Sequence, residues 1–385
     1  GLIVDASRNE FKEWSDSLLT RRNDEAHIFI LHFIPTIQCQ LKCNYCIENG
    51  ADRGKPMKMD ILTQSVQWVT QYLASHPEID HFRLVLFGGE PLLQKDLIRN
   101  ALREFHQIAN ERHIGFSTEM VSNGEFLDEP TAAMLSAHNW TRVQITLDGP
   151  QEVHDSRRHG ANGRPTFLKI VENIKMLLRT DYIRKVDVRI SLDVSNADRV
   201  IELIEELAGF PNRDNINLSL GLITPTIANP ERVIEHEELV AEKALAVWKR
   251  AKELGFEIPD TFVTGPWCVA VAKHGAVLQP DGGLQKCFCT AGRKEYDFGT
   301  ISAPVAASSY LKDPRYEQFK RTEECIAEQC PFLPVCGGGC IHNAMVEHGG
   351  GAGGKKRFCQ KILLSKMNVG LLHLSLLTVD EPVSV

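Results

Sequence analysis

The chain has 385 residues and a formal net charge of −7. This length allows a large core and more than one domain, and the mildly acidic balance argues against nucleic acid as the main partner. The sequence contains no apolar run long enough to span a membrane and no signal-peptide pattern at its start. We therefore expect a cytoplasmic protein without a membrane partner.

Short apolar strands alternate with amphipathic helices from about residue 28. The pattern predicts strands at 27–34, 82–90, 115–124, 142–149, 184–194 and 215–223, and helices at 60–76, 97–112, 129–138, 166–179, 197–209 and 236–255. Six β-α units in series imply a parallel sheet with helical crossovers. Because a closed barrel has eight units, we expect an α/β fold with an open, partial (β/α)6 TIM-like barrel or a doubly wound sheet. In both, the site lies at the C-terminal strand ends.

Alternation along the last three of these strands separates a polar face from an apolar face. The polar residues are Gln144, Thr146 and Asp148 in the fourth strand, Asp187, Arg189, Ser191 and Asp193 in the fifth, and Asn217, Ser219 and Gly221 in the sixth. A closed barrel fills its lumen with branched apolar side chains, so we expect these polar residues to line a wet cavity instead. Such a cavity suits a bulky polar substrate such as a peptide. The alternative is that they are solvent-exposed positions at a sheet edge.

The composition changes from residue 265, where cysteine, glycine and proline become frequent. The sequence predicts a hairpin with a Pro-Asp-Gly-Gly turn at 276–287, a helix at 313–324, a flexible loop at 348–356 and a closing helix at 363–377. We therefore divide the chain into an N-terminal extension (1–27), a partial barrel (28–235), a connecting helix (236–264), a second domain stapled by metal (265–365) and a C-terminal helix or tail (366–385).

Eleven cysteines in a chain without an export signal are more typical of metal ligands than of disulfides. Cys39, Cys43 and Cys46 follow the first predicted strand with the spacing C-x3-C-x2-C, and the other eight lie after residue 267. Structural zinc takes four nitrogen or sulfur ligands, and no fourth cysteine is near the first three. A 4Fe–4S cubane held by three thiolates instead leaves one iron open to a chelating small molecule.

A second motif, FGGEP at 87–91, follows the second predicted strand. The adjacent glycines Gly88 and Gly89 let backbone atoms approach a ligand closely. Their carbonyls can accept hydrogen bonds from an ammonium group, which Glu90 can neutralise. Taken alone, a glycine pair at a strand end is most often a turn.

Together, the three-cysteine motif, with Tyr45 as its aromatic residue, and the GGEP sequence ending at Pro91 resemble the radical SAM superfamily. The resemblance implies that Cys39, Cys43 and Cys46 hold a 4Fe–4S cluster and that S-adenosylmethionine chelates the open iron. It implies that the Gly88–Glu90 turn receives the amino group of this cofactor and that Tyr45 stands beside its adenine. One-electron cleavage would then release a 5′-deoxyadenosyl radical that abstracts a hydrogen atom, with the cofactor supplying the chemistry and the protein the positioning. Zinc remains the alternative.

Two further stretches continue this resemblance. VSNGEFLD contains Asn123, and ITLDGPQEVHDSRR matches a motif after the fourth strand, with Thr146 in place of serine. The family implies contacts to the ribose or carboxylate of the cofactor near Thr146 and Arg158. The alternative for Arg158 is a surface arginine on a loop.

The late cysteines resemble the SPASM extension of radical SAM peptide maturases. The family's wiring implies two auxiliary 4Fe–4S clusters, and so three clusters in all, that serve electron transfer. One would be held by Cys268, Cys287 and Cys340, and the other by Cys325, Cys330, Cys336 and Cys359. Cys289 either completes the first set or is a spare beside an open iron. Cys325 stands two residues earlier than the family pattern places its counterpart, and a zinc-ribbon role stays open for any single one of these cysteines.

Within this family we favour a maturase that links two residues of a ribosomally made precursor peptide through a cyclophane carbon–carbon, thioether or ether bond. Formylglycine-type oxidation of a protein would require an aspartate where this chain has Phe288. Epimerisation would require a hydrogen donor, for which Cys289 is the candidate. Oxidation of a small molecule and a non-catalytic iron–sulfur scaffold or electron carrier are further alternatives.

Two aspartates on the polar strand faces, Asp148 and Asp193, are the predicted proton acceptors. Their alternative role is a charge pair with Arg189 or a contact with a cofactor hydroxyl. The 27 residues before the first strand are too few for a leader-recognition domain, which has roughly 80 residues. We therefore expect the precursor peptide to bind the core or a separate leader-binding protein, and a flavodoxin or ferredoxin to donate electrons.

Overall fold

A computed structural model describes residues 9, 12–13, 25–230, 237–263, 268–303, 318–349 and 356–376. Most of the predicted N-terminal extension and most of the predicted loop at 348–356 lie outside these residues. None of the described helices is long and apolar enough to cross a membrane.

One mixed sheet organises the fold, with the strand order β6-β5-β4-β3-β2-β1-β7-β8-β9. The parallel strands are β1 (Ile28–Phe33), β2 (His81–Leu86), β3 (Gly115–Ser122), β4 (Trp140–Thr146), β5 (Val186–Leu192), β6 (Ile216–Leu222) and β7 (Gly275–Leu278). The last strands, β8 (Gly283–Gln285) and β9 (Gly299–Thr300), pair in antiparallel fashion. Because β6 and β9 do not pair, the barrel is partial, as predicted.

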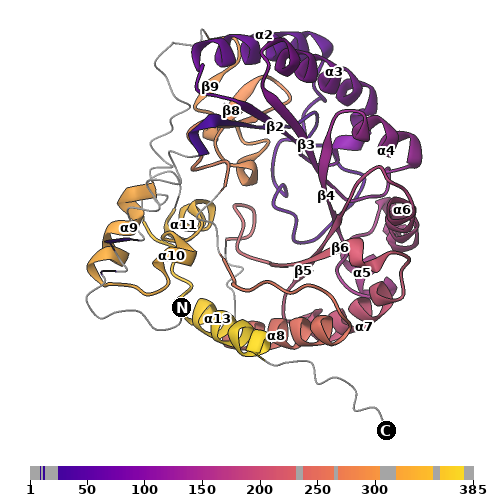
Figure 1. Cartoon of the computed structure of the whole chain (residues 1–385), viewed down its shortest axis with the longest axis vertical. Coiled ribbons are helices and arrows are strands. Elements are labelled where there is room, and N and C mark those ends of the chain that lie inside the picture. The colour runs from indigo at the N-terminus through magenta and orange to yellow at the C-terminus, as the bar shows by residue number, and fades with distance from the viewer. Residues whose placement is uncertain are drawn as a thin grey trace.

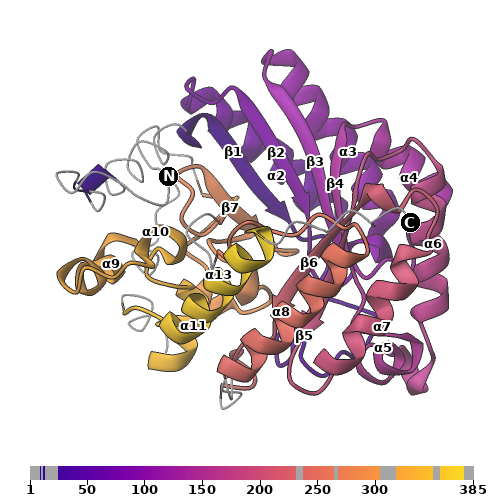
Figure 2. The same ribbon diagram turned by 60° about the horizontal axis from the view of Figure 1, so that its bottom comes forward.

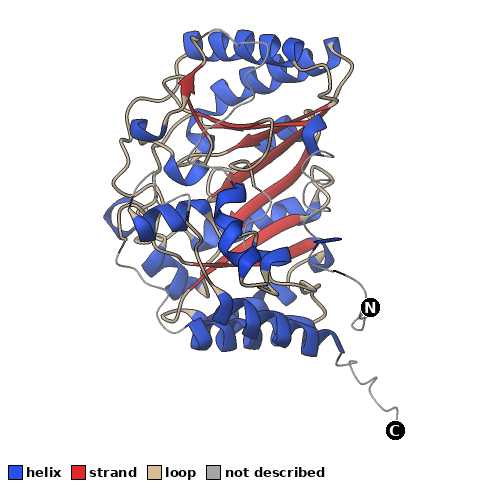
Figure 3. Ribbon diagram, turned by 90° about the vertical axis from the view of Figure 1, so that its left-hand side faces the viewer, coloured by secondary structure: helices blue, strands red, loops and turns tan. Residues whose placement is uncertain are grey.

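Helices cover the outside of this sheet. They are α2 (Met59–Ser75), α3 (Lys95–Glu111), α4 (Glu129–Ser136), α5 (Gln151–Arg157), α6 (Phe167–Arg179), α7 (Ala197–Ala208), α8 (Glu237–Glu253), α9 (Gln318–Ala327), α10 (Leu333–Cys336), α11 (Ile341–His348) and α13 (Lys361–Leu376). In Figure 1 the helices from α2 to α8 trace an incomplete ring around the strands, and α9, α10 and α11 lie on its remaining side. Figure 3 shows the strands crossing the middle of the molecule between helices.

The apolar periodicity of the helices explains their packing. In α3, for example, Leu97, Ala101 and Phe105 recur at helical spacing and are buried. The ring of Phe105 packs edge-on against Phe82 of β2, with ring centroids 5.7 Å apart. The side of β2 that holds Phe82 and Leu84 therefore faces the helices, and the side that holds Arg83 is left for the lumen.

The late hairpin forms as predicted but extends the barrel sheet. β7 lies beside β1, and Leu278 and Leu284 belong to the same hydrophobic core as the barrel strands. Figure 2 shows β7 next to β1 with α9, α10 and α11 beyond it. Of the helix predicted at 313–324, only the part from Gln318 lies within the described residues. The short helix α5 was not predicted, because its seven residues carry too little periodic signal.

Candidate active site

A cavity of about 660 Å³ occupies the lumen of the partial barrel and reaches the carboxyl ends of its strands. Its wall includes Cys39, Cys43, Tyr45, Cys46, Gly88, Gly89, Asn123, Thr146, Arg158, Arg189, Ser191, Gly221, Cys268 and Cys289. The cavity therefore lies where parallel β-α folds build their sites. It brings the three early cysteines and two of the late ones to a single space.

The polar strand faces contribute to this cavity. Thr146, Arg189 and Ser191 line it, whereas Val188 and Ile190 of β5 are fully buried on the opposite face. Ser191 is itself only 7% exposed, so this face is enclosed, unlike a solvent-exposed sheet edge. The prediction of a polar lumen is confirmed at these positions.

Sequence reasoning missed a ladder of charges across the lumen. Arg142 of β4 pairs with Asp187 of β5 at 2.5 Å and with Glu119 of β3 at 3.6 Å, and Glu119 also pairs with Arg83 of β2 at 3.5 Å. Arg83, Glu119 and Arg142 line the cavity. The signal was available, because these residues alternate with apolar ones along their strands. Such a ladder offers both charge signs to a polar substrate.

The three early cysteines lie in the loop after β1, and all of them line the cavity. Burial raises the pKa of Cys39 to about 12 and that of Cys46 to about 11. Thiols in this setting become thiolates only when a cation compensates, and a coordinating metal deprotonates them outright. Within the described residues, the compact group of metal-type ligand atoms, all within 4.8 Å of one another, lies elsewhere. The early cysteines are therefore not arranged as a tight mononuclear site.

The glycine turn after β2 fixes this cysteine loop. The backbone N–H of Gly89 donates to the Thr36 carbonyl at 3.0 Å, and that of Glu90 donates to the Gln38 carbonyl at 2.9 Å. A Cβ atom at Gly89 would stand 2.6 Å from the carbonyl carbon of Gln38 and closer still to two carbonyl oxygens. Gly88 has φ of +128° and would meet Thr36 in the same way. The glycines thus allow two backbones to touch, and they also border the cavity.

The Glu90 side chain connects the turn after β2 to the end of β3 through hydrogen bonds. Its carboxylate is fully buried and accepts hydrogen bonds from the Ser122 hydroxyl at 3.0 Å and from the backbone N–H groups of Asn123 at 2.8 Å and Leu92 at 3.0 Å. Burial raises the pKa of Glu90 to about 7, although these hydrogen bonds oppose the rise. Glu90 is not among the cavity-lining residues, and Pro91 begins the short 3-10 helix at Pro91–Gln94.

Tyr45 joins the cysteine loop to the end of β4. Its hydroxyl donates to Asp148 at 2.5 Å and accepts from Arg158 at 2.6 Å. The Arg157 guanidinium stands 5.1 Å from the centre of the Tyr45 ring, within cation–π range. Burial raises the pKa of Tyr45. Arg158 is only 8% exposed, so the alternative of a surface arginine does not describe it.

The two predicted proton acceptors share one arginine. Arg157 lies 3.2 Å from Asp148 and 3.2 Å from Asp193. Asp148 is fully buried, and neither aspartate is among the cavity-lining residues. The charge-pair alternative is thus realised, with Arg157 in place of Arg189. Their role as proton acceptors stays a prediction.

Three other predicted positions border the cavity. The side-chain amide of Asn123 lies 3.8 Å from the Cys39 sulfur, and Thr146 lies nearby at the end of β4. Arg189 extends over Gly221, where a Cβ would collide with its guanidinium. Burial lowers the pKa of Arg189. A buried arginine at a cavity wall is suited to an anionic group such as a carboxylate.

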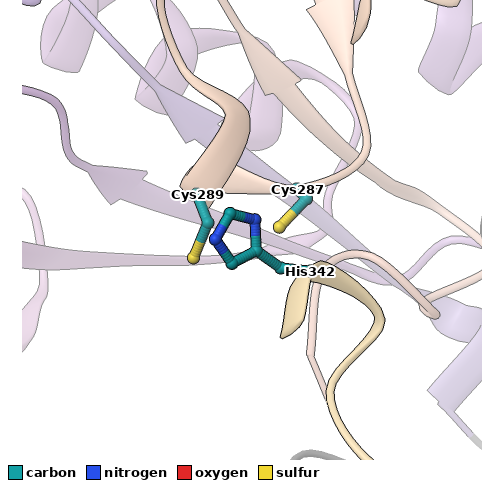
Figure 4. A group of neighbouring side chains, drawn as sticks. All are labelled: Cys287, Cys289 and His342. Atoms are coloured by element: carbon teal, nitrogen blue, oxygen red, sulfur yellow. The ribbon is translucent and has the colours of Figure 1, made fainter. Parts of the chain in front are cut away.

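Four late cysteines lie near one another, and two of them, Cys268 and Cys289, line the cavity. The thiols of Cys268, Cys287, Cys289 and Cys340 lie close enough to interact electrostatically. The structure therefore brings Cys289 together with the three cysteines assigned by resemblance to the first auxiliary cluster. A residue that sequence reasoning missed, His342, joins them, because one of its ring nitrogens and the sulfurs of Cys287 and Cys289 lie within 4.8 Å of one another (Figure 4).

The remaining late cysteines surround a second, much smaller cavity of about 30 Å³. Cys325, Cys330, Cys336 and Cys359 all line it, together with Arg357. Cys325 belongs to α9 and is buried, so its unusual spacing does not separate it from the other three. The late cysteines thus lie in two separate groups, and their role as cluster ligands stays a prediction.

Arg293 ties the late segment to the early cysteine loop. Its guanidinium donates to the carbonyls of Ile47 at 3.2 Å and Asn49 at 2.6 Å. The backbone N–H of Asp52 also donates to the Gly292 carbonyl at 3.0 Å. These contacts hold the two cysteine-bearing walls of the cavity against each other.

Phe288, the residue that stands where formylglycine formation would require an aspartate, packs on His32. The two rings are stacked with centroids 5.4 Å apart, and both line the cavity. Burial lowers the pKa of His32 to about 3. This part of the wall is therefore neutral and aromatic.

Part of the chain resembles known proteins. Residues 33–207 match the family model described as the radical SAM superfamily. Over 139 residues the chain is 28% identical to a cysteine-type anaerobic sulfatase-maturating enzyme of Clostridium perfringens. This aligned region covers 34% of this chain and 36% of that enzyme. Over 208 residues it is 29% identical to the sporulation killing factor maturation protein SkfB of Bacillus subtilis. This aligned region covers 53% of this chain and 46% of SkfB. The chain thus matches about a third to a half of the length of these curated relatives.

A solved structure has the same fold over a longer span. It is described as native anSMEcpe with bound AdoMet and Cp18Cys peptide, and it covers 90% of this chain and 96% of its own, with a TM-score of 0.63 and 16% identity. The likeness at this identity concerns the fold, and it agrees with the partial barrel seen here.

Proposed function

We propose that this chain is a radical SAM enzyme that removes a hydrogen atom from a precursor peptide, because residues 33–207 match the model of the radical SAM superfamily. The single observation that carries the proposal is the placement of Cys39, Cys43 and Cys46 on the wall of a large cavity that both polar and apolar side chains line. Their spacing and their burial suit a cluster with one open iron better than a closed zinc site.

The residues around this wall fit the cofactors of the superfamily. Cys39, Cys43 and Cys46 would hold a 4Fe–4S cluster, and S-adenosylmethionine would bind at its open iron. Bound there, the pair supplies one-electron cleavage of the sulfonium and a 5′-deoxyadenosyl radical. Within the described residues, the Nε atom of Arg158 and the Oδ1 atom of Asp148 are buried without a hydrogen-bond partner. Such orphaned polar atoms are costly unless a ligand satisfies them.

The chain's own residues would orient the cofactor. We place Arg189 and Thr146 at its carboxylate, Asn123 and the Gly88–Gly89 turn at its amino end, and Tyr45 beside its adenine. Arg158 and Asp148 fix the Tyr45 hydroxyl from both sides, at 2.6 Å and 2.5 Å. Glu90 supports these contacts indirectly, because its carboxylate accepts a hydrogen bond from the backbone N–H of Asn123 and so joins the glycine turn to that residue.

A peptide is the favoured substrate. The lumen presents the charges of Arg83, Glu119 and Arg142 to whatever enters it. The names of the matched proteins point the same way, since SkfB is described as a maturation protein and the matched structure contains a bound peptide. We favour an intramolecular crosslink of the cyclophane, thioether or ether type. Formylglycine formation is disfavoured by Phe288, which leaves no carboxylate beside Cys287.

A crosslink removes two hydrogen atoms from the peptide, one as an atom and the other as a proton and an electron. The enzyme therefore needs an electron acceptor, and the two late cysteine groups would supply it as auxiliary 4Fe–4S clusters in a SPASM domain. The first group shares the cavity through Cys268 and Cys289, which places it within reach of the substrate.

Anaerobic reconstitution followed by dithionite and S-adenosylmethionine tests the proposal. We expect 5′-deoxyadenosine from the native chain, none from Cys43→Ala, and about twelve irons per chain, four for each of three cubanes. With a candidate peptide encoded beside the gene for this chain, a crosslink appears as the loss of two hydrogen masses. Absence of 5′-deoxyadenosine from the fully loaded native chain would falsify the proposal.

A further inference from the structure

His342 is a buried histidine that the proposed function does not use. It is only 3% exposed, and neither of its ring nitrogens has a hydrogen-bond partner within the described part of the chain. It lies in the first turn of α11, two residues after Cys340. Figure 4 shows its imidazole between the thiols of Cys287 and Cys289.

The surroundings of the imidazole give it no other role. Apolar residues pack around the cysteines of this group, among them Ala270, Ile341 and Met345, and the charged group that acts on the imidazole is Arg293, a cation that cannot accept a hydrogen bond from it. A buried polar group without a partner costs about 1–3 kcal/mol, so an unligated imidazole here would destabilise the fold. A thiol tolerates the same setting better, because free cysteine behaves as a small apolar residue.

Five candidate ligands therefore surround one auxiliary centre. A cubane has four irons, and each takes one protein ligand, so one of Cys268, Cys287, Cys289, Cys340 and His342 is surplus. Cys289 is the best candidate for the surplus position. The resemblance assigns Cys268, Cys287 and Cys340 to this centre and leaves Cys289 unassigned, and Cys289 borders the large cavity, as Cys268 also does, where a thiol can meet solvent or substrate.

We propose that His342 is the fourth protein ligand of the auxiliary centre held by Cys268, Cys287 and Cys340, and that Cys289 remains a thiol on the cavity wall. This inference rests on the proposed function, because it assumes that the late cysteines hold a cluster. One neutral imidazole in place of a thiolate removes one negative charge from the centre. Imidazole ligation raises the reduction potential of iron–sulfur centres, which favours electron uptake from the substrate.

The first experiment looks for the nitrogen. The full chain carrying Cys39→Ala, Cys43→Ala and Cys46→Ala is reconstituted anaerobically, so that only the auxiliary centres contribute, and the reduced protein is studied by pulsed EPR with 15N-labelled histidine. We expect a histidine nitrogen coupling that is lost in His342→Ala and in His342→Cys but retained in Cys289→Ser. His342→Cys should keep the iron, because it restores a ligand, and should lower the reduction potential of the centre.

The second experiment counts the free thiol. Cys268 and Cys289 both border the cavity, so they form a matched pair for anaerobic alkylation of the loaded native chain. We expect iodoacetamide to label Cys289 and to spare Cys268, as read by mass spectrometry.

Three results would overturn the inference: no histidine coupling in the loaded chain, a coupling that survives His342→Ala, or alkylation of neither cysteine. Failure of the proposed function is read separately, from the absence of 5′-deoxyadenosine when the native chain receives S-adenosylmethionine.

Discussion

Gly89→Ala is the sharpest test of how the cysteine loop is positioned. The added Cβ would lie 2.6 Å from the carbonyl carbon of Gln38, and contacts under 3.0 Å do not occur in real structures. The segment leading to Cys39 must therefore withdraw by about 0.4 Å or more, and further to clear the carbonyl oxygens. Overpacking of this kind costs about 1–3 kcal/mol, and a misplacement near 1 Å can lower a rate about 100-fold.

We expect Gly89→Ala to form 5′-deoxyadenosine about 10- to 100-fold more slowly than the native chain, with the iron of the late cysteine groups retained. Gly299→Ala is the matched control, because a Cβ at Gly299 would meet nothing within 4 Å. The assay is the rate of 5′-deoxyadenosine release under anaerobic conditions, with iron content measured in parallel. A Gly89→Ala protein that matches Gly299→Ala in both quantities would refute the argument that backbone contact positions the cluster loop.

Three further predictions address neighbouring features. Tyr45→Phe removes the hydroxyl shared by Asp148 and Arg158, so we expect weaker S-adenosylmethionine binding and a loss of about 1–3 kcal/mol in unfolding free energy, read by titration and urea unfolding. Cys330→Ser should remove about four irons per chain, read by iron analysis. The pKa of Glu90 is about 7 when folded, against an ordinary 4.5, so stability of the metal-free chain should fall by about 3 kcal/mol as pH rises from 4.5 through 7. Glu90→Gln should abolish this slope, and an unchanged slope would contradict the assignment.

Periodicity was sufficient to predict the barrel. Each parallel strand and each long helix of the barrel lies within a few residues of its prediction, because the spacing of the apolar residues that bury one face is visible in the sequence. The strand at 184–194, for instance, was found as Val186–Leu192. The helix α5 escaped because seven residues span only two turns. Its prediction would have required the contacts that Arg157 makes with Asp148 and Asp193.

Side-chain partners were harder to predict than elements. The sequence indicated that Gly88, Gly89 and Glu90 act together, but it could not show that the glycines press against the backbone of residues 36–38. It likewise predicted for Asp148 either a charge pair with Arg189 or a contact with the cofactor. In the structure, Asp148 contacts Arg157 and Tyr45. These pairings depend on which loops meet at the strand ends, which no local pattern encodes. His342 was missed for the same reason, because one histidine after a glycine run carries no local signal.

Cysteines from the early group and from the late group border the same cavity. The early cysteines, Cys268 and Cys289 all border the cavity, and Arg293 joins the two cysteine-bearing loops through the carbonyls of Ile47 and Asn49. A substrate group in the lumen would thus share one cavity with the source of the radical and the acceptor of the electron. Since the charge ladder of Arg83, Glu119 and Arg142 faces the same space, the peptide would be held there by its polar groups. Loss of the hydrogen bonds from Arg293 to the carbonyls of Ile47 and Asn49 should therefore uncouple hydrogen abstraction from electron uptake without removing either centre.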